Sequence, residues 1–440
     1  MMLFMRDNRK MNKKILDIAF PSIISNITVP LLGLVDTAIA GHLGAAAYIG
    51  AIAVGGMLFN MIYWLFGFLR MGTGGLTAQA FGAGLREETV RILLRALGVG
   101  LLIAVLLIFC SEWILQVTYL WIEGTEEVKK LAASYFRILI WAAPAVLLQY
   151  GFTGWFLGQQ NARFPMWVAI VQNLVNIGVS LFLVVGCGWK VEGVAWGTFV
   201  AQYAALLLSV LLTLQYYRRS FVAEVFRSVW TRSEISRFFR VNRDIFFRTL
   251  CLVGVTVSFT SIGAAQGDVV LAANALLMQF FVCFSYVMDG FAYAGEAIGG
   301  MYFGAKDRKN YRLLVRQLFR WGTGLVVCFT LVYGLAGPFF LSLLTSNREV
   351  FAMAVDFLPY AVIIPLAGFM AFLYDGLFIG ATETLGMLLA ILVASLAFAV
   401  ILWLALPIWG NHALWGAFLL YLFLRGAFQW KYSARLERKL

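Results

Sequence analysis

Twelve long apolar runs constrain this chain more than any other feature of its sequence. A helix that crosses the hydrocarbon core of a bilayer needs about 20 apolar residues, because its backbone groups find no other hydrogen-bonding partners there. The chain has 440 residues, 62% of them hydrophobic and only 13% charged, whereas soluble domains carry about 25% charged residues. The sequence therefore predicts an all-α polytopic membrane protein. The runs lie near 15–41, 47–72, 92–117, 131–158, 164–186, 192–216, 243–265, 268–299, 313–336, 350–380, 384–408 and 411–431.

The basic residues between the runs indicate a topology. With the N-terminus placed inside, the inner segments hold 27 Lys and Arg residues and the outer loops hold 4. Because Lys and Arg resist translocation, we expect a multi-pass protein of the cell inner (plasma) membrane with both termini in the cytoplasm. The net charge of +12 then reflects topology, and we expect the bilayer, but no nucleic acid, as a partner.

The two halves of the chain are related. Three motifs recur at offsets of 222, 222 and 219 residues: Phe81-Gly82-Ala83 as Phe303-Gly304-Ala305, Leu157-Gly158 as Ile379-Gly380, and Ala195-Trp196-Gly197 as Leu414-Trp415-Gly416. Each half holds six runs, an even number, so the copies are parallel repeats, a common plan among transporters. We predict an N-terminal six-helix lobe over 1–216, a cytoplasmic linker over 217–242 and a C-terminal six-helix lobe over 243–440. A repeat retained for folding alone is the alternative.

Asp36 is the first candidate functional residue, since a carboxylate inside a bilayer is costly and usually marks a site. It follows Ile15 by 21 residues, or roughly 30 Å along a helix, which places it in the outer half of the bilayer. Its repeat counterpart is Ser258. Because burial disfavours the charged form of a carboxylate, we predict that Asp36 exchanges protons near neutral pH. A structural, hydrogen-bonded acid is the alternative.

Pro21 and Pro30 lie in the same run as Asp36. A proline removes a backbone donor and clashes with the preceding turn, so we expect kinks at both positions. Either the kinks are static, or the helix bends when the charge of Asp36 changes.

Polar residues in other runs of the N-terminal half form a candidate substrate or coupling network. Asn176 and Ser180 are four residues apart and share a helical face, which Asn173 joins. Thr198 and Thr153 are further candidates from neighbouring runs. Such residues also serve as interhelical hydrogen bonds, which is the alternative.

The C-terminal half has three acids within its runs, Asp289, Glu296 and Asp375. They lie toward the predicted cytoplasmic ends of their runs, and Asp289 and Glu296 share a face. They form either an inner gate that pairs with basic residues or merely interfacial charges; the candidate partners are Arg70, Arg316 and Arg320.

The sequence contains no G-x-x-x-x-G-K-[ST] loop for ATP, no nucleophile–base pair and no metal-binding cluster. We therefore expect that the protein is not an enzyme and binds no cofactor. An ion gradient is then the expected energy source for transport.

Several motifs resemble the multidrug and toxic compound extrusion (MATE) family, and its DinF branch in particular. They cover residues 21–26, 30–43, 68–83, 242–244, 289–294 and 375–381. The resemblance implies twelve helices in two six-helix lobes, a V-shaped central cavity and cation-coupled export of drug-like compounds.

The resemblance also implies roles for individual residues. It makes Asp36 the family's coupling acid and Pro21 its bending proline, with Asn176 and Thr198 in the network of the acid. Many relatives have a second acid where this chain has Ser180, and this difference favours H⁺ over Na⁺ coupling. Some relatives place a cation site in the C-terminal lobe, which keeps Na⁺ open through Asp289, Glu296 and Asp375.

We therefore predict a monomeric, proton-coupled exporter of amphipathic, often cationic compounds. A Na⁺-coupled exporter and a lipid or lipid-linked-sugar flippase are the alternatives. A flippase would need several basic residues to hold phosphate, and the basic residues within or beside the runs are few: Arg70, Arg137 and Arg248.

Overall fold

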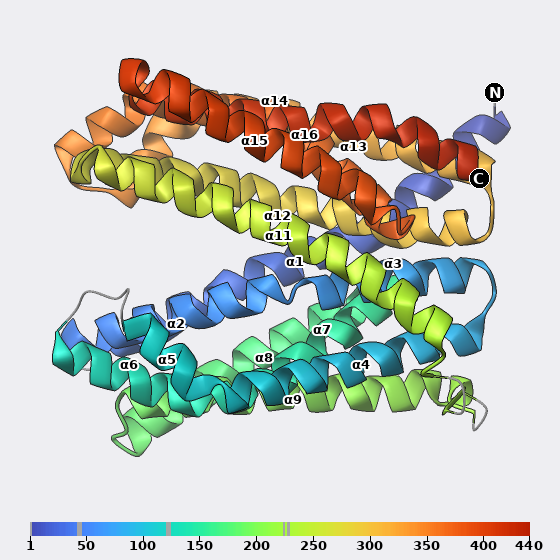
Figure 1. Ribbon diagram of the computed structural model, residues 1–440, viewed down its shortest axis with the longest axis horizontal. Helices are drawn as coiled ribbons and strands as arrows, with labels where there is room; N and C mark the ends of the chain where they lie inside the picture. Colours follow the sequence, from blue (N-terminus) through green and yellow to red (C-terminus); the bar gives the residue numbers. More distant parts are fainter. Residues whose placement is uncertain (1, 42–45, 120–124, 223–224, 227–228) are drawn as a thin grey trace. The chain divides into compact units, whose positions relative to one another are not determined.

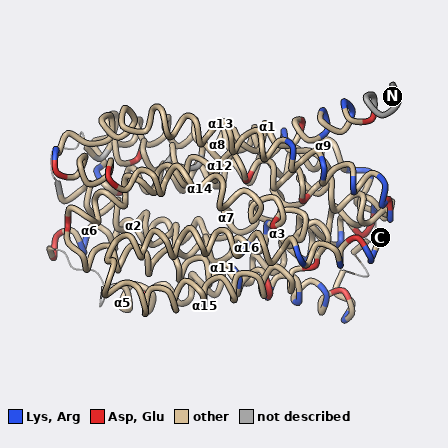
Figure 2. The backbone as a smooth tube through the Cα atoms, turned by 90° about the horizontal axis from the view of Figure 1, so that it is seen from above, with Lys and Arg blue, Asp and Glu red and all other residues tan. Residues whose placement is uncertain are grey.

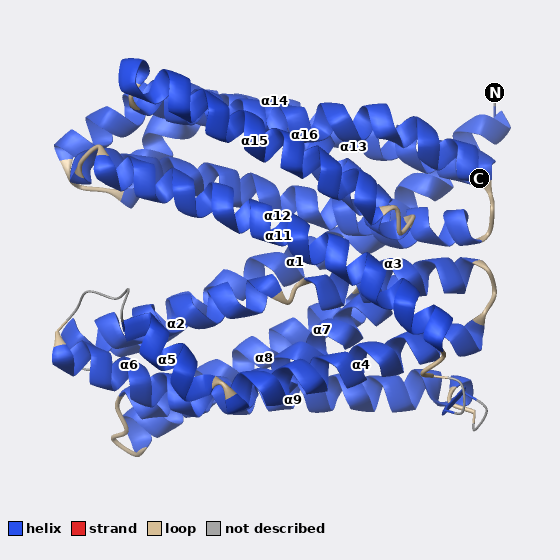
Figure 3. Ribbon diagram, in the orientation of Figure 1, coloured by secondary structure: helices blue, strands red, loops and turns tan. Residues whose placement is uncertain are grey.

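The computed structural model describes the whole chain except residues 1, 42–45, 120–124, 223–224 and 227–228. The described residues form helices and loops, with no strand among them (Figure 3). Eleven helical stretches in this part of the chain are long and apolar enough to cross a membrane. The chain is an all-α multi-pass membrane protein, as predicted.

The helices form two compact units. The N-terminal unit comprises Ile24–Phe238, and the C-terminal unit comprises Phe239–Leu440 together with the beginning of the chain through Ile23. The first helix, α1 (Met2–Gly41), therefore contributes to both units. It is helical through Pro21 and Pro30, and the boundary between the units falls between these prolines.

The N-terminal unit continues with short and long helices. α3 and α4 both pack against α7, and α8 packs along α9 (Figure 1). The elements are α2 (Ala46–Leu65), α3 (Phe68–Gly82), α4 (Arg86–Phe109), α5 (Ser111–Tyr119), α6 (Glu126–Leu139), η1 (Ile140–Ala142), α7 (Ala143–Gly158), α8 (Arg163–Leu181), η2 (Phe182–Gly186), α9 (Val191–Tyr217) and η3 (Arg218–Ser220).

Several predicted runs of this unit are interrupted, which hydropathy alone does not reveal. The second run breaks at Phe66 and Gly67, between α2 and α3, and the third breaks at Cys110, between α4 and α5. The fourth run tightens into the 3₁₀ turn η1 just before Pro144. Proline has no N–H for the carbonyl one turn earlier, so the preceding turn cannot continue as a regular α-helix.

The C-terminal unit contains long, mostly uninterrupted helices. Asp307 and Asn347 cap the amino ends of α13 and α14 by accepting hydrogen bonds from backbone N–H groups. Charged residues concentrate near the helix ends (Figure 2). The helices are α11 (Arg232–Ala265), which begins in the N-terminal unit, α12 (Asp268–Gly304), α13 (Arg308–Leu344), α14 (Arg348–Gly380), α15 (Thr384–Trp409) and α16 (Asn411–Lys439).

The described part of the predicted linker 217–242 is packed on α4. The buried Arg95 guanidinium donates from Nε to the Val229 carbonyl at 2.6 Å and pairs with Glu88, also at 2.6 Å. The ring of Trp230 lies over Gly98. α11 begins at Arg232, eleven residues before the predicted seventh run, so this segment is partly helical and anchored.

Backbone geometry repeats at the offset that the sequence predicts. The residues with positive φ include three pairs that are 222 positions apart: Gly84 with Lys306, Gln160 with Thr382, and Gly188 with Gly410. Each pair ends equivalent helices of the two halves. Because few residues adopt positive φ, this agreement supports the internal repeat independently of sequence similarity.

Close helix packing repeats as well. A Cβ atom on Gly154 would lie 2.2 Å from the Arg70 carbonyl oxygen, and one on Gly376 would lie 2.0 Å from the Ala292 carbonyl oxygen. These positions are again related by 222 residues. Glycine is therefore required where α7 crosses α3 and where α14 crosses α12, because backbone meets backbone there.

We expect Gly376→Ala to lower the free energy of unfolding by about 2 kcal/mol, because the added methyl group collides with a carbonyl that cannot move freely. Gly254→Ala, on an exposed part of α11 with no atom near the added methyl group, is the matched control. Thermal unfolding of the purified protein in detergent measures both. Equal melting temperatures for the two variants would contradict this packing argument.

Candidate functional site

Asp36 lies on α1 in the interior of the N-terminal unit and is 4% exposed. The Thr198 hydroxyl on α9 lies 3.1 Å from the Asp36 Oδ2 atom and 3.1 Å from the Val194 carbonyl oxygen. That hydroxyl also accepts a hydrogen bond from the Asn176 amide of α8 at 2.9 Å. A hydroxyl has one hydrogen, so donation to Asp36 competes with donation to the carbonyl of its own helix. The carboxylate is thus held by a donor that has an alternative partner.

Asp36 has no ion-pair partner among the described residues, and its Oδ1 atom accepts no hydrogen bond from them. The Asn176 Oδ1 atom and the Ser180 hydroxyl are likewise buried without a described partner. Ser180 packs directly against Gly197, the residue before Thr198. Three buried oxygen atoms on these residues therefore remain available to a proton, a water molecule or a cation.

Tyr135 of α6 belongs to this site, although the sequence analysis did not single it out. It is 3% exposed and lies near both Asp36 and Thr198. Its ring packs against Gly55 of α2, where a Cβ atom would come within 2.4 Å. One tyrosine among 17 has no local sequence signal, so only the packing of α6 against α2 and α9 identifies it.

Two predicted network residues lie outside this cluster. Asn173 is half-buried, and its amide donates to the Ala169 carbonyl of its own helix at 2.9 Å. Thr153 accepts from the Gln149 amide at 3.3 Å, and Gln149 in turn accepts from Ser209 at 2.9 Å. Thr153 therefore belongs to a separate contact between α7 and α9.

Asp375 on α14 is the centre of a buried ionic cluster in the C-terminal unit. Arg248 of α11 and Arg425 of α16 both donate to its Oδ2 atom, the latter at 2.8 Å, and Gln429 donates to Oδ1. All four side chains are buried. A carboxylate held by two guanidinium groups is neutralised in place and is a poor ligand for a further cation.

These partners differ from those proposed from the sequence. Arg316 and Arg320 are exposed and have no described ion pair, and Asp375 is paired with Arg248 and Arg425 instead. Arg425, which the charge count placed with the cytoplasmic flank, is buried instead. The other two acids lie on α12, where Glu296 is 1% exposed and Asp289 is half-buried.

The arrangement can be compared with known proteins. The family model described as MatE matches residues 21–182 and 245–405, one segment in each half of the chain. The chain belongs to the MatE family. Its members are transporters, and the DinF-type resemblance is confirmed: DNA damage-inducible protein F of Escherichia coli K12 is 40% identical over 420 residues, which cover 94% of this chain and 90% of the relative.

More distant relatives and solved structures include other multidrug resistance proteins and MATE transporters. The probable multidrug resistance protein NorM of Acinetobacter baylyi is 23% identical over 360 residues, 80% of this MatE chain and 79% of the relative. Among solved structures, the Vibrio cholerae MATE transporter VcmN in the bent form has a TM-score of 0.86 at 18% identity, with 98% of each chain covered. A MATE protein in the bent conformation has a TM-score of 0.86 at 16% identity, covering 98% of this chain and 96% of the other. These structures share the fold.

We expect Arg425→Gln to lower the free energy of unfolding by about 3 kcal/mol, because it weakens the neutralisation of a buried carboxylate. Glu112→Gln is the control, since it removes an exposed ion pair with Arg137 and should change little. Thermal unfolding in detergent measures both. If Arg425→Gln unfolds at the temperature of the unmodified protein, the cluster does not stabilise the unit.

Proposed function

We propose that this MatE protein is a secondary active multidrug exporter in which proton uptake at Asp36 drives efflux. The observation that carries the proposal is that Asp36 is buried and, among the described residues, has no cationic partner. A substrate cation or a proton can therefore supply the missing positive charge, but only one at a time. This exclusion is the basis of antiport.

The Thr198 hydroxyl can change its hydrogen-bond acceptor when Asp36 takes up a proton. When Asp36 is charged, the hydroxyl donates to the carboxylate; when Asp36 is protonated, the hydroxyl is released to the Val194 carbonyl 3.1 Å away. We propose that this change loosens α1 from α9. Pro21 and Pro30 leave two carbonyls of α1 without their helical donors, so α1 bends at these positions when it loosens.

The substrates that fit this chemistry are amphipathic and often cationic drug-like compounds. The names of the NorM relatives, multidrug resistance proteins, support this class. We further propose that the protein is a monomer of the inner membrane. The distribution of basic residues supports a topology with both termini in the cytoplasm. No cofactor other than the coupling ion is needed.

Sodium coupling is the second candidate. It is supported by the unpartnered oxygens of Asp36, Asn176 and Ser180, since Na⁺ prefers several oxygen ligands. Asp375 is unsuited to the same role, because Arg248 and Arg425 occupy it. A C-terminal cation site would therefore depend on Asp289 and Glu296.

A flippase for lipids or lipid-linked sugars has less support. It needs basic side chains free to hold phosphate inside the membrane. Among the described residues, Arg248 and Arg425 are bound to Asp375, and Arg95 is bound to Glu88.

We expect Asp36→Asn to abolish both drug resistance in cells and substrate-evoked proton movement in proteoliposomes, because the variant can no longer exchange a proton. Asp17→Asn, an exposed acid on the same helix, is the matched control and should transport normally. The assay follows lumenal pH after addition of a cationic dye, with and without Na⁺. Unchanged proton flux in Asp36→Asn would refute the proposal, and flux of dye that requires Na⁺ would favour the second candidate.

Thr198→Val should slow transport by roughly tenfold, because it removes a hydrogen bond to a charged group. Thr213→Val, the same change on the same helix, should leave transport unchanged, since the Thr213 hydroxyl donates to the Ser209 carbonyl of its own helix at 2.8 Å. Dye efflux from proteoliposomes at matched protein density measures both. Equal rates for the two variants would remove Thr198 from the coupling network.

A further inference from the structure

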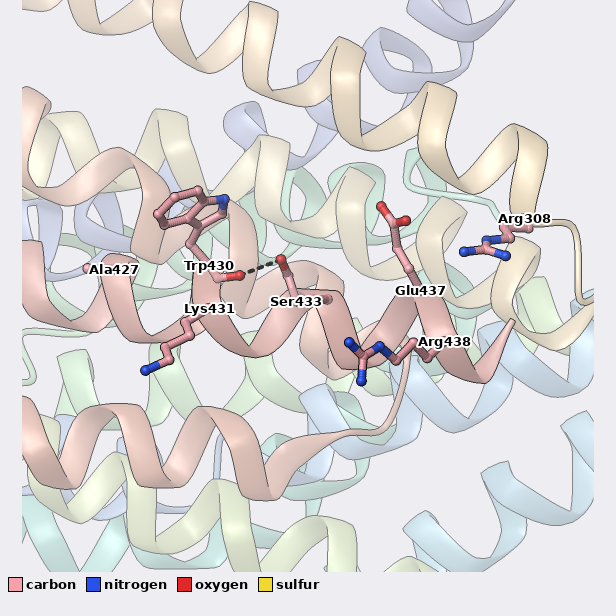
Figure 4. A pocket seen from close by; sticks show the side chains of 8 residues that line it. Arg308, Ala427, Trp430, Lys431, Ser433, Glu437 and Arg438 are labelled. Carbon is pink, nitrogen blue, oxygen red and sulfur yellow. Dashed lines mark hydrogen bonds between the residues drawn. The ribbon is translucent and has the colours of Figure 1, made fainter.

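A groove of about 660 Å³ lies on the C-terminal unit between the beginning of α13 and the end of α16. Figure 4 shows the side chains that surround it, with Lys431 and Arg438 extending from one side of α16 and Arg308 reaching from α13. The other lining residues are Ala427, Trp430, Ser433, Ala434 and Glu437. The groove is remote in sequence from Asp36, and no step of the proposed transport cycle uses it.

The groove carries uncompensated positive charge. The side chains of Arg308, Lys431 and Arg438 are exposed and have no hydrogen-bond or ion-pair partner in the described part of the chain. The single acid that lines the groove, Glu437, is bound to Arg312 of α13 at 2.9 Å. Three cations without a described partner therefore line the groove, against one acid that is already paired, and this excess of positive charge suits an anionic ligand.

The groove also lies at a change in the character of the exposed surface of α16. Phe423 and Trp430, two turns apart, are 53% and 63% exposed, as expected of a surface that faces lipid. Lys431 and Arg438 follow them in the last turns of the helix. An exposed tryptophan followed by basic side chains is typical of the level where acyl chains meet headgroups.

From these observations we propose that the groove binds the headgroup of an acidic phospholipid. The phosphodiester lies among Arg308, Lys431 and Arg438, and an acyl chain runs along the surface formed by Phe423 and Trp430. Basic pockets between membrane helices bind such headgroups in this way, because phosphate accepts several charge-assisted hydrogen bonds. The proposal depends on the membrane location of the chain and not on the drug or the coupling ion.

Native mass spectrometry of the full-length protein in detergent tests the proposal, with phosphatidylglycerol and phosphatidylcholine as the two probes. We expect phosphatidylglycerol to bind more tightly than phosphatidylcholine. The triple variant Arg308→Gln, Lys431→Gln and Arg438→Gln should weaken phosphatidylglycerol binding by roughly tenfold or more. Because all three side chains are exposed, the variant should unfold at the temperature of the unmodified protein.

The matched control removes three exposed charges elsewhere, through Arg218→Gln, Arg219→Gln and Arg232→Gln, and should bind phosphatidylglycerol normally. Equal losses in the two triple variants would show that only net charge matters and would overturn the site. Equal affinity for the two lipids would overturn it as well. Displacement of the lipid by inorganic phosphate at the same concentration would replace the lipid assignment by a free-phosphate site.

Discussion

The hydrocarbon core of a membrane offers no hydrogen bonds, and each polar group placed there must find its partner within the protein. For the backbone this requirement dictates helices throughout, which the described part of the chain obeys. For side chains it leaves fewer options, and two buried acids of this protein use opposite ones. Asp375 is held by two arginines and a glutamine, whereas Asp36 is held by one hydroxyl that has a second possible partner.

This contrast separates an acid whose charge is fixed by its neighbours from one whose charge is free to change, and it supports the role proposed for Asp36. Removing the charge of Asp375 would strand two guanidinium groups, so its ionisation is fixed by its neighbours. Removing the charge of Asp36 would strand no cation, because among the described residues its hydrogen-bond donor, the Thr198 hydroxyl, has a second acceptor in the Val194 carbonyl. The internal repeat sharpens the comparison. The counterpart of Asp375, 222 residues earlier, is Thr153 in a neutral contact with Gln149, and the counterpart of Asp36 is Ser258, so neither acid is repeated in the other half.

Helical periodicity identified part of the Asp36 cluster but did not show which of its side chains meet. Asn176 and Ser180 share the buried face that their spacing predicts, but Asn173, placed on the same face, bonds to the carbonyl of Ala169. Spacing gives the direction of a side chain only to within a broad arc, and the amide nitrogen of a residue at the edge of that arc can donate to its own helix, while the Asn173 Oδ1 atom stays buried without a described partner. Arg425 was misassigned for a related reason: counting charges along the chain cannot distinguish a basic residue in a flank from one that turns inward to meet an acid on another helix.

The sequence by itself determined the class of protein and the internal repeat, and it singled out Asp36 as a candidate, because all three follow from one-dimensional patterns: apolar length, a recurring motif and a single charge in an apolar run. Only the tertiary structure decided which residues meet. The contact of Tyr135 with the Asp36 site, the capture of Asp375 by Arg248 and Arg425, and the close crossings at Gly154 and Gly376 each join segments far apart in the chain. Such contacts depend on how helices pack, and no local pattern encodes the rotation and depth at which one helix meets another.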